Sequence, residues 1–416
     1  MRMLDASTIK PDQHAMKIQE AIIQDGDVVL TGAFDFSGKN VVIAAPHQVN
    51  IRGDVSCGVK PTINGGGWKQ IISGKEVFHP TFEINSKFSV TIEDLQLINS
   101  LRVAILLNAA PGLLIKHCTI QAPISDQPPG QNFHTAVGFI MAGNVNITGE
   151  ISLDSNVFEI GDGTTDGRTD RTLGILINKA GSPTSTVRIS GNIISNVTGR
   201  GIEFRDYSRS GIIESNRITM SPKGVLEPDF LANGIRCGSL GKWQISSNTI
   251  ECSSPDSGGI LLLCNSVSQS LAATVIDGNS ITMSIPEEVL PGTRAAGIEL
   301  FQNCSGTVVT NNRFSGRAQN AFSILKGVIT DQNGNELSFS PTGNTFSDND
   351  HWDLSSLDSD ISVGVGATNT MIGIRPLGFK TSTAARDHDP NTEIKTRATV
   401  KDHGTDTKMT GPHILI

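Results

Sequence analysis

Apolar side chains alternate with polar ones over short stretches, and these stretches recur through most of the chain. One recurring phrase is an asparagine followed by alternating apolar residues, at Asn156, Asn192, Asn216, Asn248, Asn279, Asn312 and Asn344. Its intervals run from 24 to 36 residues. A second phrase begins with glycine, at Gly138, Gly174, Gly201, Gly234, Gly259 and Gly297. Each repeat therefore predicts at least two short strands separated by turns.

Such short strands cannot bury their apolar side alone, but stacking each turn of chain on the last closes a continuous core. The repeat therefore predicts a parallel β-solenoid. Asparagine suits a fixed point in every turn because it tolerates the left-handed backbone of a sharp corner and can pair its amide with the next turn. We assign the recurring asparagines to a structural ladder and exclude them from catalysis.

This pattern resembles the right-handed parallel β-helix superfamily of pectate-lyase-like proteins. The opening segment, residues 14–54, looks like the entry of that superfamily, where a short amphipathic helix caps the solenoid. The resemblance implies an all-β, single-domain right-handed parallel β-helix. We expect an N-terminal cap with a short helix at 1–27, about eleven coils over 28–374, and an irregular C-terminal tail at 375–416. The tail is expected to wrap the solenoid or a neighbouring subunit.

Composition limits the possible partners and location. With 416 residues, of which 37% are hydrophobic and 18% charged, the chain can bury a large core. A formal net charge of −8 gives no basic footprint for nucleic acid or an anionic membrane. The N-terminus lacks the apolar region of a secretory signal, so we expect a soluble, cytoplasmic protein. An unconventional export route is also compatible with this feature.

The six cysteines contain no CxxC pair and are spread over about 250 residues. This spacing favours reduced core residues over a zinc site or a disulfide scaffold. No histidine pair or aspartate-rich loop has metal-binding spacing, so we expect neither a metal nor a cofactor.

Loop lengths give the first indication of a site. The spacing from an asparagine phrase to the next glycine phrase is 18 residues after Asn156, Asn216 and Asn279, but 9 after Asn192 and 11 after Asn248. Long loops at one corner should form walls around two slots, over the coils that contain Gly201 and Gly259. Loops that are longer than a turn requires often form a functional site. The alternative role for these loops is a contact between subunits of an oligomer.

The first slot gathers charged residues. With Ile202 and Phe204 inward, Glu203 faces outward and Arg236 lies one coil away, ~4.8 Å. Paired carboxylates beside cations permit acid–base catalysis, and arginine can hold a substrate carboxylate. The predicted catalytic residues are Glu203, Asp206, Tyr207 and Asp170. The predicted substrate-binding residues are Arg205, Arg236, Arg171, Arg168 and Asp229. The alternative for Glu203 and Arg236 is an inter-coil salt bridge.

Glu299 also faces outward, but it lies three coils from Glu203, ~14 Å. This exceeds the ~5 to 9.5 Å between the carboxylates of a glycosidase. We therefore do not pair the two glutamates.

The second slot is apolar, since Leu261 and Leu263 face outward there. An open groove for a hydrated polymer is rarely so apolar. Either a second subunit covers this face, with a symmetric homotrimer favoured, or the leucines bind a partly hydrophobic substrate.

The resemblance narrows the function. The motifs of polygalacturonases, calcium-dependent pectate lyases and alginate epimerases are not found in this chain. Of the remaining types, the chain most resembles the inulin fructotransferases, which are metal-independent trimers that cleave and cyclise fructan ends with a carboxylate pair. This implies a carbohydrate-active enzyme, acting on an oligosaccharide as a lyase, an intramolecular glycosyl transferase or a hydrolase.

Two other functions remain open. The chain has three tryptophans and one tyrosine, few for stacking on sugars. An isomerase or cyclase acting on a small, partly apolar metabolite is therefore one alternative. A non-catalytic structural or adhesive β-helix is the other.

Overall fold

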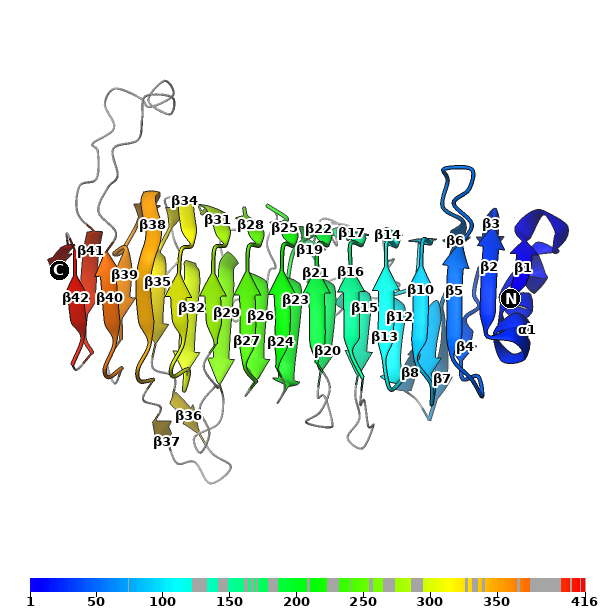
Figure 1. Cartoon of the computed structure of the whole chain (residues 1–416), viewed down its shortest axis with the longest axis horizontal. Helices are drawn as coiled ribbons and strands as arrows, with labels where there is room; N and C mark the ends of the chain where they lie inside the picture. Colours follow the sequence, from blue (N-terminus) through cyan, green and yellow to red (C-terminus); the bar gives the residue numbers. More distant parts are fainter. Residues whose placement is uncertain are drawn as a thin grey trace, which may run out of the picture.

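The computed structural model describes all residues except 74, 122–132, 141–148, 161–163, 166–167, 170, 179–185, 208–209, 223–231, 240, 254–256, 265–273, 286–294, 326–327, 331–335, 339–340, 365–366, 375–397, 405, 412 and 416. For residues 75–76, 133–140, 164–165, 168–169, 171, 178, 206–207, 239, 328–330, 336–338 and 352 only the backbone is described. The described chain winds into an elongated solenoid of parallel strands, with the N-terminus at one end and the C-terminus at the other (Figure 1).

The strands stack into three faces. Faces A and B share β38 and together form one 24-stranded sheet, whereas sheet C has 13 strands. Face A contains β1 (Arg2–Asp5), β2 (Asp27–Thr31), β5 (Val49–Gly53), β10 (Val90–Glu93), β13 (Leu113–Lys116), β16 (Ile151–Asp154), β21 (Val187–Ser190), β24 (Gly211–Glu214), β27 (Trp243–Ser246), β30 (Val275–Asp277), β33 (Val308–Thr310), β38 (Thr345–Ser356), β40 (Met371–Ile374) and β42 (Lys408–Thr410).

Face B contains β3 (Ala33–Asp35), β6 (Thr62–Asn64), β11 (Gln96–Ile98), β14 (Thr119–Gln121), β17 (Val157–Glu159), β22 (Ile193–Val197), β25 (Arg217–Met220), β28 (Thr249–Cys252), β31 (Ser280–Ser284), β34 (Arg313–Ala318) and part of β38. Sheet C contains β4 (Val41–Ile43), β9 (Phe82–Asn85), β12 (Val103–Ala109), β15 (Phe133–Ile140), β20 (Arg171–Asn178), β23 (Arg200–Tyr207), β26 (Ala232–Ser239), β29 (Ser257–Cys264), β32 (Ala296–Gln302), β35 (Asn320–Leu325), β39 (Ile361–Val363), β41 (Ala398–Asp402) and β43 (His413–Leu415).

Among the described residues, three antiparallel hairpins complete the set of strands: β7 (Trp68–Ile72) with β8 (Lys75–His79), β18 (Thr164–Thr165) with β19 (Arg168–Thr169), and β36 (Val328–Thr330) with β37 (Glu336–Ser338). The helical segments are η1 (Ala6–Thr8), η2 (Pro11–Gln13) and α1 (His14–Asp25). None of the described helices is long and apolar enough to cross a membrane.

The core consists of columns of identical or similar side chains. Because parallel strands pair in register, the inward residue of one coil lies on that of the next. One such column on face A runs Val28, Ile51, Ile92, Ile115, Leu153, Ile189, Ile213, Ile245, Ile276, Val309, Phe346 and Ile372. All of these side chains are at most 1% exposed. Burying a side chain of this size contributes roughly 1.5–3 kcal/mol.

The asparagine ladder exists and is buried. The Oδ1 atom of Asn216 accepts from the backbone N–H of Asn192 at 3.0 Å and from its Nδ2 at 2.9 Å. The same pattern joins Asn156, Asn192, Asn216, Asn248, Asn279, Asn312 and Asn349. The last rung is therefore Asn349 and not the predicted Asn344. Asn344 caps a different corner, where its Oδ1 accepts from the backbone N–H of Thr307.

The left-handed corner residue is the one before each rung. Ser155, Gly191, Ser215, Ser247, Gly278, Asn311 and Asp348 have φ between 53° and 65°. The expectation that the ladder asparagine itself adopts this conformation is wrong. Its side-chain amide explains the choice of residue, because it satisfies buried backbone groups of the neighbouring turns.

The glycine phrase marks a close approach between coils. At Gly174, Gly201, Gly234, Gly259 and Gly297, an added Cβ would lie 2.3 to 3.0 Å from a carbonyl oxygen of the next coil. A larger residue would therefore push adjacent coils apart at this corner.

The predicted helical cap is present. Helix α1 buries Ala15, Ile18 and Ile22 against the first coil. Its Gln19 also pairs with the exposed edge of β4, since Val42 donates to Gln19 Oε1 at 2.7 Å and Gln19 Nε2 donates to the Val42 carbonyl at 2.6 Å. The side-chain amide thus replaces a strand at the edge of sheet C.

The solenoid extends past the predicted boundary at residue 374. Of the described strands in sheet C, eleven lie between residues 28 and 374, which agrees with the expected coil number. Strands β41, β42 and β43 then pair in parallel with β39, β40 and β41. The described strands between residues 398 and 415, a range assigned to the tail from the sequence, therefore form further coils. They lack the asparagine and glycine phrases that mark the earlier repeats.

The cysteines follow the core pattern with one exception. Cys118, Cys237, Cys252, Cys264 and Cys304 are buried, whereas Cys57 is exposed, and all six are free. Burial raises the pKa of Cys118 and of Cys252 to about 12, so these thiols are poor nucleophiles in the native state.

We expect one fast-reacting thiol in the native protein. A chromogenic disulfide reagent at pH 8 should label Cys57 rapidly and the five buried cysteines only after unfolding in denaturant. A Cys57→Ser variant should lose the fast phase and keep the slow one. Rapid labelling of two or more thiols in the wild type would contradict the buried placement.

Candidate functional site on the outer surface of sheet C

One outward column of sheet C crosses the predicted site. Successive coils contribute Leu176, Glu203, Arg236, Leu261, Glu299, Ser323, Ser362 and Lys401 in register. Arg236 thus lies beside Glu203 on the next coil, as the sequence predicts. Charged, apolar and polar stretches follow one another along the column.

Glu203 lies at the centre of an arginine cluster. Arg205 forms a forked contact with it, from Nε to Oε1 at 2.7 Å and from Nη2 to Oε2 at 3.0 Å. Arg236 Nη1 lies 3.5 Å from Oε1, and Arg200 Nη1 also donates to Oε1. The Glu203 side chain is 0% exposed. Because its carboxylate is occupied by three guanidiniums, this geometry favours an anchoring role over proton transfer.

Sequence reasoning missed Arg200. This residue precedes Gly201 at the corner where the chain enters β23, and simple alternation from Ile202 places it inward. In the structure Arg200 instead contacts Glu203, three residues further on.

The other charged residues predicted for this slot cannot be assigned side-chain positions. Asp206 and Tyr207 lie in β23, Arg168 in β19 and Arg171 in β20, and only their backbones are described. Asp170 and Asp229 lie outside the described residues. Their proposed roles remain predictions.

The leucine slot is not an open surface. Leu261 and Leu263 do face outward, in register with Glu299 and Phe301. They are nevertheless only 3% and 8% exposed in the single chain. The expectation that a second subunit or a hydrophobic ligand must cover them is therefore corrected, since the chain itself covers both. The homotrimer, which the resemblance to trimeric β-helix enzymes also implies, stays a prediction.

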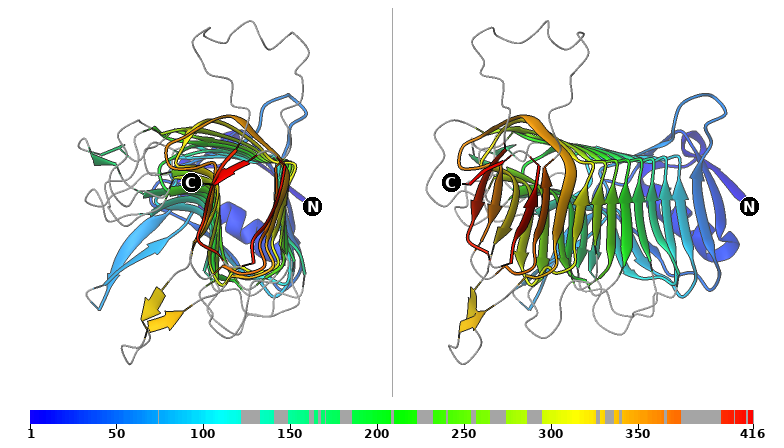
Figure 2. Two further views of the ribbon diagram at one scale, coloured as in Figure 1. Left: turned by 90° about the vertical axis from the view of Figure 1, so that its left-hand side faces the viewer. Right: turned by 60° about the vertical axis from the view of Figure 1, so that its left-hand side comes forward.

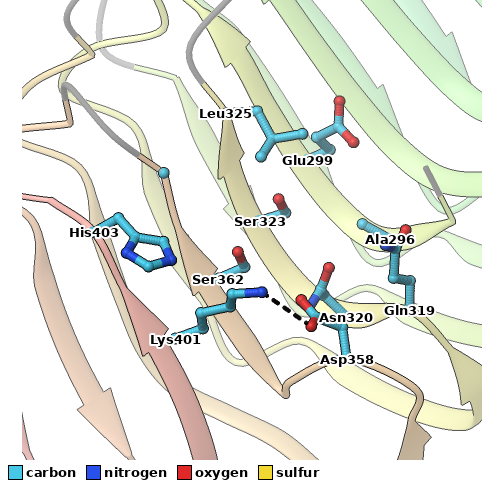
Figure 3. A pocket seen from close by; sticks show the side chains of 11 residues that line it. Ala296, Glu299, Gln319, Asn320, Ser323, Leu325, Asp358, Ser362, Lys401 and His403 are labelled. Carbon is cyan, nitrogen blue, oxygen red and sulfur yellow. Dashed lines mark hydrogen bonds and ion pairs between the residues drawn. The ribbon is translucent and has the colours of Figure 1, made fainter. Parts of the chain in front are cut away.

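A hollow of about 310 Å³ opens further along the same sheet, across β32, β35, β39 and β41 (Figure 3). This volume is at the lower end of the range of ligand pockets. Its lining consists of Ala296, Glu299, Gln319, Asn320, Ser323, Leu325, Asp358, Ser362, Gly364, Lys401 and His403.

Eight of the eleven lining residues carry hydrogen-bonding side chains. Lys401 Nζ contacts Asp358 Oδ1 at 3.3 Å, and Asn320 Nδ2 is fixed by the Ser359 carbonyl at 2.8 Å. Glu299, which is 5% exposed, lies on the opposite side from Asp358, with Ser323 between them (Figure 3). The hollow thus offers carboxylate, amide, hydroxyl, ammonium and imidazole groups to one ligand.

This hollow was not predicted as a site. Glu299 was considered only as a partner for Glu203, and Lys401 and His403 fell in the supposed tail. Within the described part of the chain, no cluster of three or more histidine, cysteine or acidic side chains is suited to hold a metal ion.

Comparison with known proteins addresses the fold. No curated protein matches the chain. A solved structure of PfbA, a surface adhesin of Streptococcus pneumoniae, is 12% identical, with a TM-score of 0.52, and the match covers 89% of this chain and 93% of that chain. The structure of DFA-IIIase from Arthrobacter chlorophenolicus A6 in complex with GF2 is also 12% identical, with a TM-score of 0.47 and the same coverage. At this identity, the adhesin likeness concerns the fold alone.

The family described as "Right handed beta helix region" matches residues 154–371, more than half of the chain. This range includes β20, β23, β26, β29, β32, β35 and β39, which stack in register in sheet C. The stacked coils and the asparagine ladder agree with this match, and the chain belongs to the right-handed β-helix family.

Proposed function

We propose that the outer surface of sheet C binds an oligosaccharide and that the hollow around Glu299 is the place where it is processed. The observation that carries this proposal is the composition of the hollow. Four consecutive coils supply two carboxylates, amides, hydroxyls, a lysine and a histidine around one small volume. A ligand that satisfies so many hydrogen-bonding groups is itself rich in hydroxyls.

The two carboxylates of the hollow suit acid–base chemistry. Glu299 is buried, whereas Asp358 is partly exposed and contacts Lys401. Carboxylates in different surroundings can divide the roles of acid and base. We therefore assign Glu299 and Asp358 to the cleavage or transfer of a glycosidic bond.

The arginine cluster extends the binding surface. The side chains of Arg205 and Arg236 are 32% and 22% exposed, so both reach the surface along which a bound chain would run. In this account Glu203 holds the two arginines in place. An acidic sugar is the chemistry that arginine forks recognise best.

Neither alternative function is better supported. The buried leucines do not offer an open apolar wall to a small metabolite. A purely adhesive role predicts binding without turnover, and the experiments below distinguish it.

Filling the hollow should weaken binding. Ser362 lies half-buried at its centre on β39, and Ser362→Trp is expected to weaken binding of fructan or oligouronide fractions at least ~10-fold, about 1.4 kcal/mol, in calorimetric titrations. The matched control is Ser152→Trp, at a half-buried outward position of β16 on face A. Unchanged affinity in the Ser362 variant would refute the proposed binding place.

Removing the buried carboxylate should slow turnover. Glu299→Gln is expected to reduce the rate at which product is formed from the bound saccharide roughly 10²- to 10⁴-fold, while the affinity for the saccharide changes little. Glu251→Gln, which affects an exposed ion pair with Arg217, serves as the control. Binding without any turnover in the wild type would favour the adhesive function instead.

A further inference from the structure

A second polar cluster lies at the other end of sheet C, at the base of a hairpin. The hairpin β7–β8 is inserted between β6 and β9 and projects from the body of the solenoid (Figure 2). Its strands pair from Trp68 with His79 at the base to Ile72 with Lys75 near the tip.

The base of the hairpin is built around Trp68. Its indole Nε1 donates to Asn40 Oδ1 at 2.9 Å, and its ring stacks on the imidazole of His79, with centroids 4.1 Å apart and an interplanar angle of 13°. His79 Nε2 lies 3.0 Å from Gln70 Nε2, and His79 Nδ1 lies 3.5 Å from Glu83 Oε2. Since both ring nitrogens are engaged, His79 positions its neighbours and is not a free base.

Glu83 connects this base to the outer surface of sheet C. Its Oε1 accepts from Asn108 Nδ2 at 2.9 Å and from Asn85 Nδ2 at 3.1 Å. It lies in the outward column of the sheet, beside Leu106 of β12. These contacts fix the orientation of both amides, and Trp68, Glu83 and Asn108 all remain partly exposed.

We propose that Trp68, Gln70, Glu83, Asn85 and Asn108 form a second saccharide subsite. An indole face beside pre-oriented amide and carboxylate groups matches a sugar, which has an apolar C–H face and a rim of hydroxyls. Trp68 contacts Asn40 and His79 at the base of the hairpin, whereas the asparagines bond to Glu83 on the sheet. This inference rests on the proposed function, because both subsites would hold one ligand.

The separation of the two subsites sets the length of that ligand. Strands β9 and β35 are eight positions apart in sheet C, which corresponds to ~38 Å at the usual spacing. A short oligosaccharide can occupy the hollow alone, whereas a chain long enough to span ~38 Å can engage both subsites and gain from the linkage.

The test compares a short and a long fraction of fructan and oligouronide chains on the full-length protein. The double variant Asn85→Ala/Asn108→Ala leaves the stacked pair of the hairpin in place. It should weaken binding of the long fraction at least ~10-fold and leave the short fraction unchanged. The long fraction should also change the tryptophan fluorescence of the wild type, and Trp68→Phe should remove that change. Asn50→Ala on face A is the control.

Several outcomes would overturn the subsite. The subsite is wrong if the double variant binds the long fraction as tightly as the wild type does. It is also wrong if the Trp68→Phe variant keeps the fluorescence response of the wild type. If the Ser362→Trp variant still binds the saccharide and the double variant does not, only the proposed role of the hollow is overturned. A wild-type protein that binds neither fraction would overturn both proposals.

Discussion

Replacing Glu203 by glutamine is expected to lower the free energy of unfolding by about 3–5 kcal/mol. The carboxylate is fully buried and receives hydrogen bonds from Arg200, Arg205 and Arg236. Glutamine keeps the shape of the side chain but removes the charge that compensates these guanidiniums. It also presents an amide N–H₂ to groups that can only donate. Equilibrium unfolding in urea measures the difference.

The control for this substitution is Glu214→Gln. Glu214 also lies on a strand and pairs with an arginine, Arg188, but the two side chains are 26% and 47% exposed. Exposed pairs contribute only about 0–1 kcal/mol. Equal losses in the two variants would show that the Glu203 cluster is not buried as described.

Asn216→Asp is expected to cost about 2–6 kcal/mol of stability. In the native ladder Asn216 Nδ2 donates to the Ile189 carbonyl and to Asn248 Oδ1, both at 2.9 Å. Aspartate has the same shape but no donor, so two buried acceptors lose their partner and face a carboxylate. The loss should appear in the urea midpoint, with the far-ultraviolet spectrum retained at low denaturant.

Asn50→Asp provides the comparison for the ladder. Asn50 lies on β5 at an outward, partly exposed position. Surface substitutions of this kind usually change stability by less than about 0.5 kcal/mol. A tolerated aspartate at position 216 would mean that the ladder amides do not carry the hydrogen bonds assigned to them.

Most of the fold could be predicted from the sequence because successive coils of a solenoid repeat the same pattern of residues along the chain. Stacking of equivalent positions placed Arg236 beside Glu203, although the two are 33 residues apart. Prediction failed where the repeat phrase was absent or ambiguous. The coils after residue 374 lack the phrase, and the long strand β38 carries the last rung at Asn349 rather than at Asn344.

The candidate site was harder to predict for a geometrical reason. Glu299 and Lys401 share one hollow, yet they are separated by three strand pairings whose register no local pattern reveals. Alternation predicts which side of a strand a residue faces, but not whether other parts of the chain cover it. For this reason Leu261 and Leu263 were correctly placed outward and incorrectly expected to be open.

The most direct test of the account is a crystal structure with a bound oligosaccharide from the fraction that binds tightest in titration. The account predicts electron density for the sugar on the outer surface of sheet C, with one sugar unit in the hollow in contact with Glu299, Ser323 and Ser362. Density confined to face A or face B, with the hollow filled only by solvent, would contradict it.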